Sequence, residues 1–249
     1  MAAAFAILMA IMSRELIFLD TETTGNDVTT DRLCQVCYKT SKGIRTEYFK
    51  PPLPIGVKSM SITHITNKMV DDKPTFAGSD MKKELEELLV DGVLIAHNAK
   101  FDIAMLNAEG VEVPRHICTL RVARYLDEKG VVPEYNLQFL RYYLDLEVAG
   151  NPHDAEGDVN VLCAVFERLC AKVMEGGCDR DAAVEKMIEI SSKPSLYRIF
   201  NFGKHMGKTL DEVVATDKGY LEWLHKQKIA DGGTDEDWIF TLKYYLKLE

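Results

Sequence analysis

The sequence predicts an α/β protein with a small appendage, and three observations lead to this class. Short apolar runs of strand composition alternate with longer stretches in which apolar residues follow the helical period. Two of the early runs are joined by the turn Ser41-Lys42-Gly43, which is typical of an antiparallel pair. The chain has 249 residues, which is enough for one α/β domain and an additional small unit.

Five stretches have the composition of strands. The first, RELIFLD, is apolar and ends in an acidic residue, whereas the fourth, VLIAHN, closes on polar residues. The second and third flank the Ser41-Lys42-Gly43 turn, so we expect an antiparallel start to the sheet. The five ranges are 14–20, 32–40, 43–50, 93–98 and 116–119.

Helices are predicted between and after these strands because apolar residues recur at helical spacing. The clearest begins near Ala155 and reaches Met174, and Gly176-Gly177 ends it. Asn136 is expected to cap the start of the helix predicted over 136–144. The expected helical ranges are 59–66, 77–90, 99–108, 120–126, 136–144, 155–174 and 181–190.

The chain divides into a main domain, a short leading segment and a C-terminal module. Residues 1–13 are apolar but fall short of the ~20 residues of a membrane span, so we expect an unstructured segment or a start codon assigned too early. The main domain covers 14–190, and the linker Ser-Ser-Lys-Pro leads to a module at 195–249. The module reads as α+β: a hairpin-like stretch over 200–210, helices over 210–215 and 220–227, and a last helix capped by Thr234.

Charge and cysteine usage exclude some functions. The net charge of −9 argues against a general polyanion-binding surface, although a local site can still bind nucleic acid. Six scattered cysteines without a signal peptide predict a reducing cytoplasm and no disulfide framework. Cys34 and Cys37 form a lone CxxC, which in a strand would point to opposite faces and is weak evidence for zinc or redox chemistry.

Four carboxylates stand at the ends of predicted elements. Asp20 and Glu22 lie on one side of the first strand, and Asp102 and Asp158 lie in the first turns of two helices. Taken singly, each is an ordinary polar terminus or an acidic residue in a helical first turn. Together they would converge on one crevice and repel one another unless cations neutralise them. Oxygen ligands of this kind favour Mg²⁺ or Mn²⁺, and two such ions form the clamp used for phosphodiester hydrolysis.

His153 lies five residues before Asp158, after a proline in a predicted loop. With an ordinary pKa near ~6.5, it could accept a proton from an attacking water at neutral pH. The alternative is a loop histidine with only a capping or surface role.

Three blocks in the order FLDTETTG, HNAKFDIAML and HDAEGDVNVL resemble the DEDDh exonucleases, the group that includes the proofreading epsilon subunit of bacterial DNA polymerase III. The likeness covers about residues 14–175. The stretches PSLYRIF and FGKHMGKTLDEVVATDKGYLEWL resemble the C-terminal extension of bacterial exodeoxyribonuclease X. The resemblance implies a ribonuclease H-like fold with a mixed five-stranded sheet.

The resemblance also implies roles for individual residues. Asp20, Glu22 and Asp158 would hold one divalent metal, Asp20 would bridge to a second that Asp102 supports through water, and His153 would be the general base. Contacts to the 3′-terminal nucleotide would come from Thr23, His64, Asn98 and Phe101. For His64, a surface helix residue is the alternative interpretation.

Two departures from the family pattern stand out. Gln35 occupies a position in the second strand where family members usually carry an acidic residue, which leaves the tuning of the metal ligands in doubt. The stretch NDVTTD after Gly25 is polar, so opening of a duplex end does not follow from the resemblance.

These features predict a two-metal 3′–5′ exonuclease that acts on DNA 3′ ends, releases nucleoside 5′-monophosphates, and involves no membrane; a homodimer stays open. The alternatives are an exoribonuclease of the ribonuclease T or oligoribonuclease type, a polymerase proofreading subunit, and a binding module that has kept the fold.

In the C-terminal module, basic residues alternate with aromatic ones, which predicts either nucleic-acid contact or a structural appendage with an aromatic core. They are Lys193, Arg198, Lys204, His205 and Lys208, with Tyr197, Phe200 and Phe202.

Overall fold

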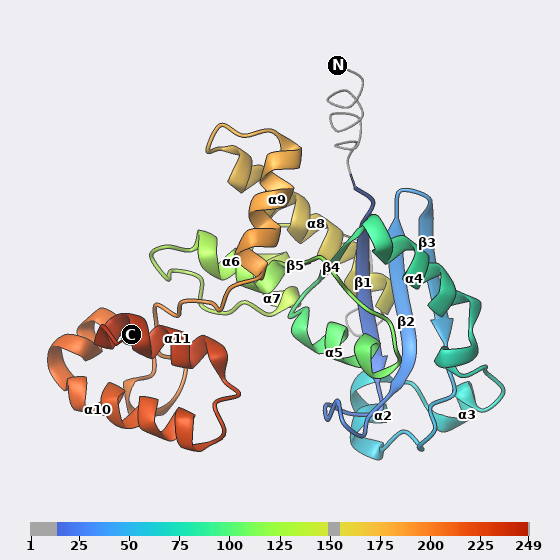
Figure 1. Ribbon diagram of the computed structural model, residues 1–249, viewed down its shortest axis with the longest axis horizontal. Coiled ribbons are helices and arrows are strands. Elements are labelled where there is room, and N and C mark those ends of the chain that lie inside the picture. The colour runs from blue at the N-terminus through green and yellow to red at the C-terminus, as the bar shows by residue number, and fades with distance from the viewer. Residues whose placement is uncertain (1–13, 149–154, 249) are drawn as a thin grey trace.

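The computed structural model describes residues 14–148 and 155–248, so His153 and the leading segment 1–13 lie outside the described residues. A five-stranded sheet in the order β3-β2-β1-β4-β5 forms the centre of the main domain (Figure 1). The strands are β1 (Leu16–Thr23), β2 (Leu33–Thr40), β3 (Gly43–Tyr48), β4 (Val93–Ala96) and β5 (His116–Cys118).

The sheet is mixed, which confirms the expected topology. β1, β2 and β3 form an antiparallel meander, whereas β4 and β5 run parallel to β1. β1 is therefore the central strand and has a neighbour on each side. The register pairs Asp20 with Cys37 and Glu22 with Gln35, and an irregularity follows between Glu22 and Thr23.

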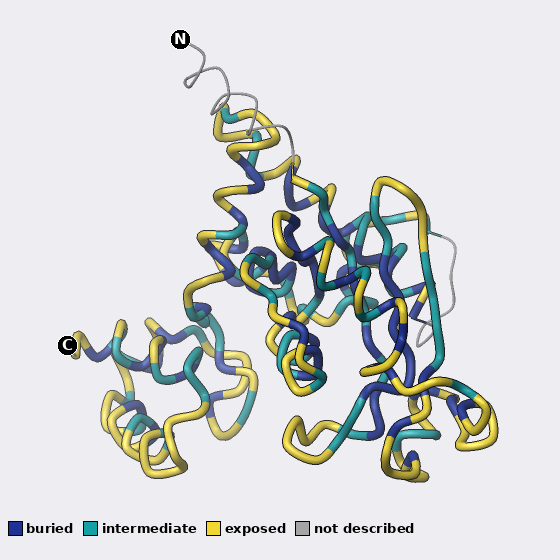
Figure 2. The backbone as a smooth tube through the Cα atoms, turned by 45° about the vertical axis from the view of Figure 1, so that its right-hand side comes forward, coloured by how far each residue is buried: buried dark blue, intermediate teal, exposed yellow. Residues whose placement is uncertain are grey.

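Helices cover both faces of the sheet (Figure 1), and Figure 2 shows buried backbone running through the middle of the main domain. On one face, Ile17, Leu19 and Leu94 pack with buried residues of α4 (Asp80–Asp91) and α5 (Lys100–Ala108). On the other face, Val93 and Ile95 pack with residues of the helices that follow β5. Those helices are α6 (Thr119–Leu126), α7 (Leu137–Tyr143), α8 (Ala155–Met174) and α9 (Arg180–Ser191).

The helix boundaries follow local signals closely. Asn136 caps α7 as predicted, since its Oδ1 accepts a hydrogen bond from the Phe139 amide at 2.8 Å. The expected helix at 59–66 lies earlier in the chain, because His64 takes a left-handed φ of 58° and ends it. The segment between β3 and α4 holds α2 (Val57–Thr63), α3 (Asn67–Val70) and the 3₁₀ turn η1 (Phe76–Gly78).

The C-terminal module has its own apolar core, formed around Phe200, Leu221 and Trp238. It contains the 3₁₀ turn η2 (Gly203–His205), α10 (Leu210–Ala230) and α11 (Glu236–Leu246). The two helices expected before α11 are both present, because non-helical backbone at Asp217 divides α10 into two helices at a kink. Across its described part, the only β-structure of the module is the isolated bridge between Ile199 and Thr209. The cap of α11 is Asp235 and not Thr234 as expected, because the Asp235 carboxylate accepts the Trp238 amide.

Charged groups fasten the module to the main domain. The buried side chain of Arg121 on α6 donates to the Ser191 carbonyl at 2.8 Å and pairs with Glu236 and Asp237 of α11. Arg124 reaches Asp237 as well, at 3.3 Å. Because these pairs join α6 to α11, the module is held by more than its linker (Figure 1).

The cysteines are free thiols, and none of the described helices is long and apolar enough to cross a membrane. Cys34 packs in a cluster with Ile55 and Ile65, whereas Cys37 packs with Ala155 and Val159 of α8. The pair thus points in different directions, as strand alternation predicts. Burial raises the pKa of the Cys34 thiol to about 12, which disfavours the reactive thiolate.

Candidate active site

The central strand β1 carries the first two candidate carboxylates. Along it, fully buried residues alternate with half-buried ones, and Asp20 and Glu22 are both half-buried. Side chains of a strand alternate between the two faces, so these two carboxylates share the face that also carries Phe18. Phe18 packs against Phe166 of α8, so this is the face that α8 covers.

Helix α8 delivers the third carboxylate. Asp158 lies in its first turn, where the neighbouring Ala155 and Gly157 are buried. The side chains of Asp20, Glu22 and Asp158 each offer a carboxylate oxygen, and these oxygens lie within 4.8 Å of one another. The structure therefore brings together three of the four carboxylates that the sequence predicted to converge.

The fourth carboxylate, Asp102, approaches from the other face of β1. It is buried in the first turn of α5, and its Oδ1 accepts a hydrogen bond from the Thr21 hydroxyl at 2.8 Å. Burial raises the pKa of the Asp102 carboxyl to about 7, although the Thr21 hydrogen bond acts in the opposite direction.

Asp20 lies at the centre of this group. Burial raises its pKa well above the ordinary value of 3.8, and the charges of Asp102, Glu22 and Asp158 raise it further, in that order. The raised pKa values of Asp20 and Asp102 favour their protonated forms unless a positive charge replaces the protons. Their ligand set consists of hard oxygen atoms only, which suits a divalent cation such as Mg²⁺ or Mn²⁺.

The structure adds a site residue that the sequence reasoning missed. Gln138 on α7 donates its side-chain amide to Oδ1 of Asp158 at 2.5 Å. The two residues are 20 positions apart and lie on different helices, so no local sequence motif predicts their contact. Gln35, which stands where family members usually carry an acidic residue, adjoins the site. It is buried and lies directly opposite Glu22 in the strand register.

The predicted nucleotide-contacting residues lie on the elements around the carboxylates. Thr23 ends β1, and its carbonyl accepts the Ser59 hydroxyl at 2.8 Å, which ties α2 to the strand. The exposed His64 follows at the end of that helix. Asn98 has a left-handed φ of 63° and is exposed just before α5, and the half-buried Phe101 lies in the first turn of that helix.

The neighbour of Asn98 is held rigidly. His97 Nε2 lies 2.7 Å from the Tyr135 carbonyl, so this nitrogen donates, and Nδ1 lies 2.9 Å from the Thr119 hydroxyl. Burial lowers the pKa of His97 to about 4, which keeps its ring neutral. His97 therefore joins the end of β4 to the loop before α7 as an uncharged structural link.

In the C-terminal module, the aromatic residues of the basic-aromatic stretch form core. Phe200 is buried, and Tyr197 and Phe202 pack against the same cluster. The Lys204 ammonium pairs with Asp217 at 2.7 Å, and the buried His205 shares that carboxylate at 3.0 Å. These contacts favour the structural interpretation for this part of the stretch.

Comparison with known proteins connects this geometry to a family. A model described as "Exonuclease" matches residues 17–166, which is more than half of the chain. The chain belongs to this exonuclease family. A second model, "Exodeoxyribonuclease X-like C-terminal", matches residues 200–228. The family resemblance read from the sequence blocks is thus confirmed in both parts of the chain.

Related proteins align with this chain over differing lengths. The chain is 30% identical to exodeoxyribonuclease 10 of Escherichia coli K12 over 239 residues, which are 93% of this chain and 99% of the relative. It is 31% identical to the DNA polymerase III epsilon subunit of Treponema pallidum over 163 residues, 61% of this chain and 74% of that one. A solved structure, "Exonuclease X in complex with 5′ overhanging duplex DNA", aligns with a TM-score of 0.54 and 25% identity, covering 71% of this chain and 99% of that chain.

The raised pKa of Asp102 predicts that the metal-free protein is destabilised by its own site. Because the folded state binds this proton more tightly than the unfolded chain, stability falls as pH rises from about 4 to about 7. Asp102→Asn should therefore raise the free energy of unfolding by about 1–3 kcal/mol at pH 8 in chelator, and by much less at pH 4.5. Urea denaturation at both pH values measures this.

The control for this prediction is Asp91→Asn, since the Asp91 side chain is fully exposed. It should leave the free energy of unfolding unchanged at both pH values. If Asp102→Asn were no more stable than the parent at pH 8, the assigned cost of burying the Asp102 charge would be wrong.

Proposed function

We propose that this protein is a metal-dependent 3′–5′ exodeoxyribonuclease that releases nucleoside 5′-monophosphates. The observation that carries the proposal is the carboxylate cluster of Asp20, Glu22 and Asp158, whose oxygens lie within 4.8 Å of one another. Asp102 places a fourth carboxylate near Asp20. Such a cluster is costly to fold and is explained by a task that needs divalent cations.

Asp20, Glu22 and Asp158 would hold one cation, and Asp20 with Asp102 would hold a second. When bound, two such cations supply positive charge to the scissile phosphate and to the attacking water. The protein's own contribution is placement. Thr21 and Gln138 orient Asp102 and Asp158 by hydrogen bonds, so the ligand oxygens keep their positions before a substrate arrives.

His153 would accept the proton of the attacking water. The assignment rests on the sequence, in which this histidine stands five residues before Asp158. A neutral imidazole with an ordinary pKa near ~6.5 is available as a base at pH 7 and above.

The terminal nucleotide would lie between the ends of β1, α2 and α5. Thr23 and His64 would contact it from one side, because the Ser59–Thr23 hydrogen bond fixes α2 to the strand. Asn98 and Phe101 would contact it from the other side at the start of α5. DNA is favoured as the substrate because the relative that spans nearly the whole chain is named an exodeoxyribonuclease.

The function is tested by incubating the purified protein with 5′-labelled and 3′-labelled DNA and RNA strands. We expect a ladder that shortens from the 3′ end of DNA in Mg²⁺ or Mn²⁺, with loss of all activity in chelator. Asp20→Ala should be inactive, whereas Asp91→Ala should retain parental activity. Degradation from the 5′ end, or full activity in chelator, would refute the proposal, and faster cleavage of RNA would favour an exoribonuclease.

His153→Ala should lower kcat by about 10²–10⁴-fold, because the attacking water loses its base. The acidic limb of the pH–rate profile should flatten, while Mn²⁺ affinity measured by calorimetry stays within about twofold of the parent. His225→Ala, in the C-terminal module, is the matched control. A parental rate and pH profile in His153→Ala would show that another group takes the proton.

Gln138→Leu tests the positioning of Asp158. The substitution keeps the side-chain size but removes the amide that donates to Oδ1 of Asp158. Loss of such a supporting contact typically costs about 10–100-fold in metal affinity or rate. We expect the Mn²⁺ concentration for half-maximal activity to rise on this scale with little change in thermal stability. The exposed Gln227→Leu is the control, and equal Mn²⁺ dependence in both variants would contradict the assignment.

A further inference from the structure

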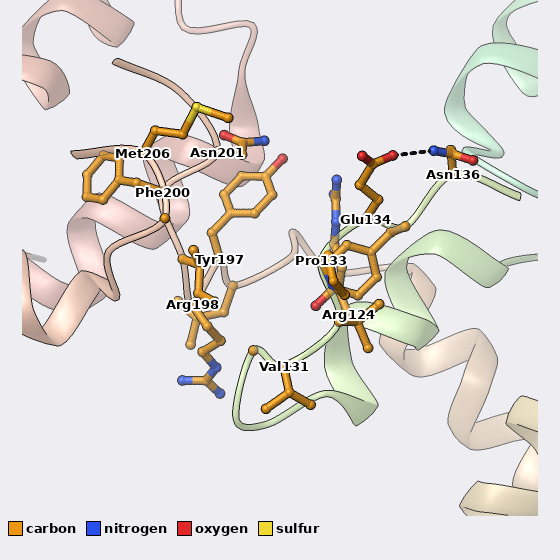
Figure 3. Close-up of a pocket in the computed structure, with 16 residues that line it drawn as sticks. Arg124, Val131, Pro133, Glu134, Asn136, Tyr197, Arg198, Phe200, Asn201 and Met206 are labelled. Atoms are coloured by element: carbon orange, nitrogen blue, oxygen red, sulfur yellow. Dashed lines mark hydrogen bonds between the residues drawn. The ribbon is translucent and has the colours of Figure 1, made fainter. Parts of the chain in front are cut away.

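A groove lies between the main domain and the C-terminal module, with a cavity volume of about 700 Å³. Figure 3 shows its two walls: Val131, Pro133 and Glu134 come from the loop between α6 and α7, and Asn201 and Met206 come from the module. Arg124 and Arg198 also line this groove.

The wall from the main domain is preformed. The Asp127 carboxylate accepts the backbone amides of Val131 and Val132 at 3.0 and 2.8 Å, and the Tyr135 hydroxyl at 2.7 Å. Gly130 has a φ of 65°, and a Cβ there would approach the Cβ of Arg198 to 2.8 Å, so the loop packs closely on the module. A wall held in this way loses little conformational entropy when a ligand binds.

The same loop is bonded to the active site. The Tyr135 carbonyl accepts His97, which adjoins Asn98 at the end of β4. Asn136 lines the groove and caps α7, and two residues later Gln138 holds Asp158. One lining residue of the groove therefore lies two positions from the residue that contacts Asp158.

The chemistry of the groove suits a nucleic-acid strand. Val131 and Met206 line it with 63% and 72% of their surfaces exposed, which provides apolar contact for bases. Arg198 lines it too and forms no ion pair with the residues that the structure describes. The lining carboxylate, Glu134, accepts a hydrogen bond from Asn136, which weakens its repulsion of a phosphate. Single-strand binding sites combine positive charge with side chains on which the bases pack.

We propose that this groove holds the single-stranded DNA that precedes the 3′-terminal nucleotide, so that the C-terminal module extends the substrate site of the exonuclease domain. The inference rests on the proposed function, because it assumes that a DNA 3′ end occupies the carboxylate cluster. Affinity for long strands then depends on the groove, whereas hydrolysis of a dinucleotide does not.

The test places negative charge on each wall at an exposed position. Val131→Glu and Met206→Glu should raise KM for a DNA strand of about 15 nucleotides by about three- to tenfold, with kcat unchanged. Neither variant should change kcat/KM for a dinucleotide. The matched control is Val90→Glu, because Val90 is 65% exposed and lies outside the groove on α4.

A second pair of variants removes positive charge. Arg198→Ala should lower the salt dependence of long-strand binding by about one unit of slope, whereas the exposed Arg168→Ala on α8 should not. Fluorescence anisotropy with a labelled strand in Ca²⁺ measures binding without a need for hydrolysis.

The outcomes separate this inference from the proposed function. If the parent hydrolyses DNA but the groove variants match Val90→Glu on long strands, the groove inference fails and the function stands. If the groove variants lose dinucleotide activity as well, they disturb the catalytic site and the inference also fails. If the parent hydrolyses nothing, the proposed function fails. Weaker strand binding by the groove variants than by the parent would then show a strand-binding groove, but would overturn its assignment to the substrate site of an exonuclease.

Discussion

The repulsion between carboxylates around Asp20 is the constraint on which the rest of the structure depends. Burial and three neighbouring acids all raise the pKa of Asp20, so the folded chain is working against its own charge there. A protein keeps such an arrangement only where the surrounding scaffold determines each position strongly. In this fold the scaffold is the central strand β1, which is paired on both sides, with a helix packed over each face.

Three features of the scaffold offset part of that repulsion. Asp102 and Asp158 both lie in the first turns of their helices, where the helix dipole favours negative charge. The Thr21 hydroxyl and the Gln138 amide then donate hydrogen bonds to these two carboxylates. No comparable donor to Asp20 is present in the described part of the chain, so a cation is the remaining way to stabilise its charged form. The hydrogen bonds to Asp102 and Asp158 thus leave the Asp20 carboxylate available to bind a ligand.

Much of this could be predicted from the sequence, because the carboxylates lie in short blocks with clear local signals. The spacing of residues predicts a strand that ends in DxE and acidic residues in the first turns of helices. It also predicts the Asn136 cap. What could not be predicted depends on contacts between remote segments. Gln138 meets Asp158 only when α7 packs on α8, and Gln35 lies beside Glu22 only through the strand register. Caps were also misplaced where adjacent residues compete, as with Thr234 and Asp235.

The C-terminal module shows why a residue pattern and a surface must be distinguished. Its basic and aromatic residues alternate in sequence, yet Phe200 is buried in the core and Lys204 is paired with Asp217. The surface of the groove between the two parts is formed instead by residues 196–201, by Met206 and Gly207, and by the main-domain loop that Asp127 organises. Because Arg121 and Arg124 join α6 to Glu236 and Asp237 of α11, that surface keeps a defined position relative to the carboxylates. If the groove holds substrate as proposed, the ion pairs between the main domain and the module act on substrate geometry as well as on stability, since loosening them would move one wall of the groove while leaving Asp20 and its neighbours in place.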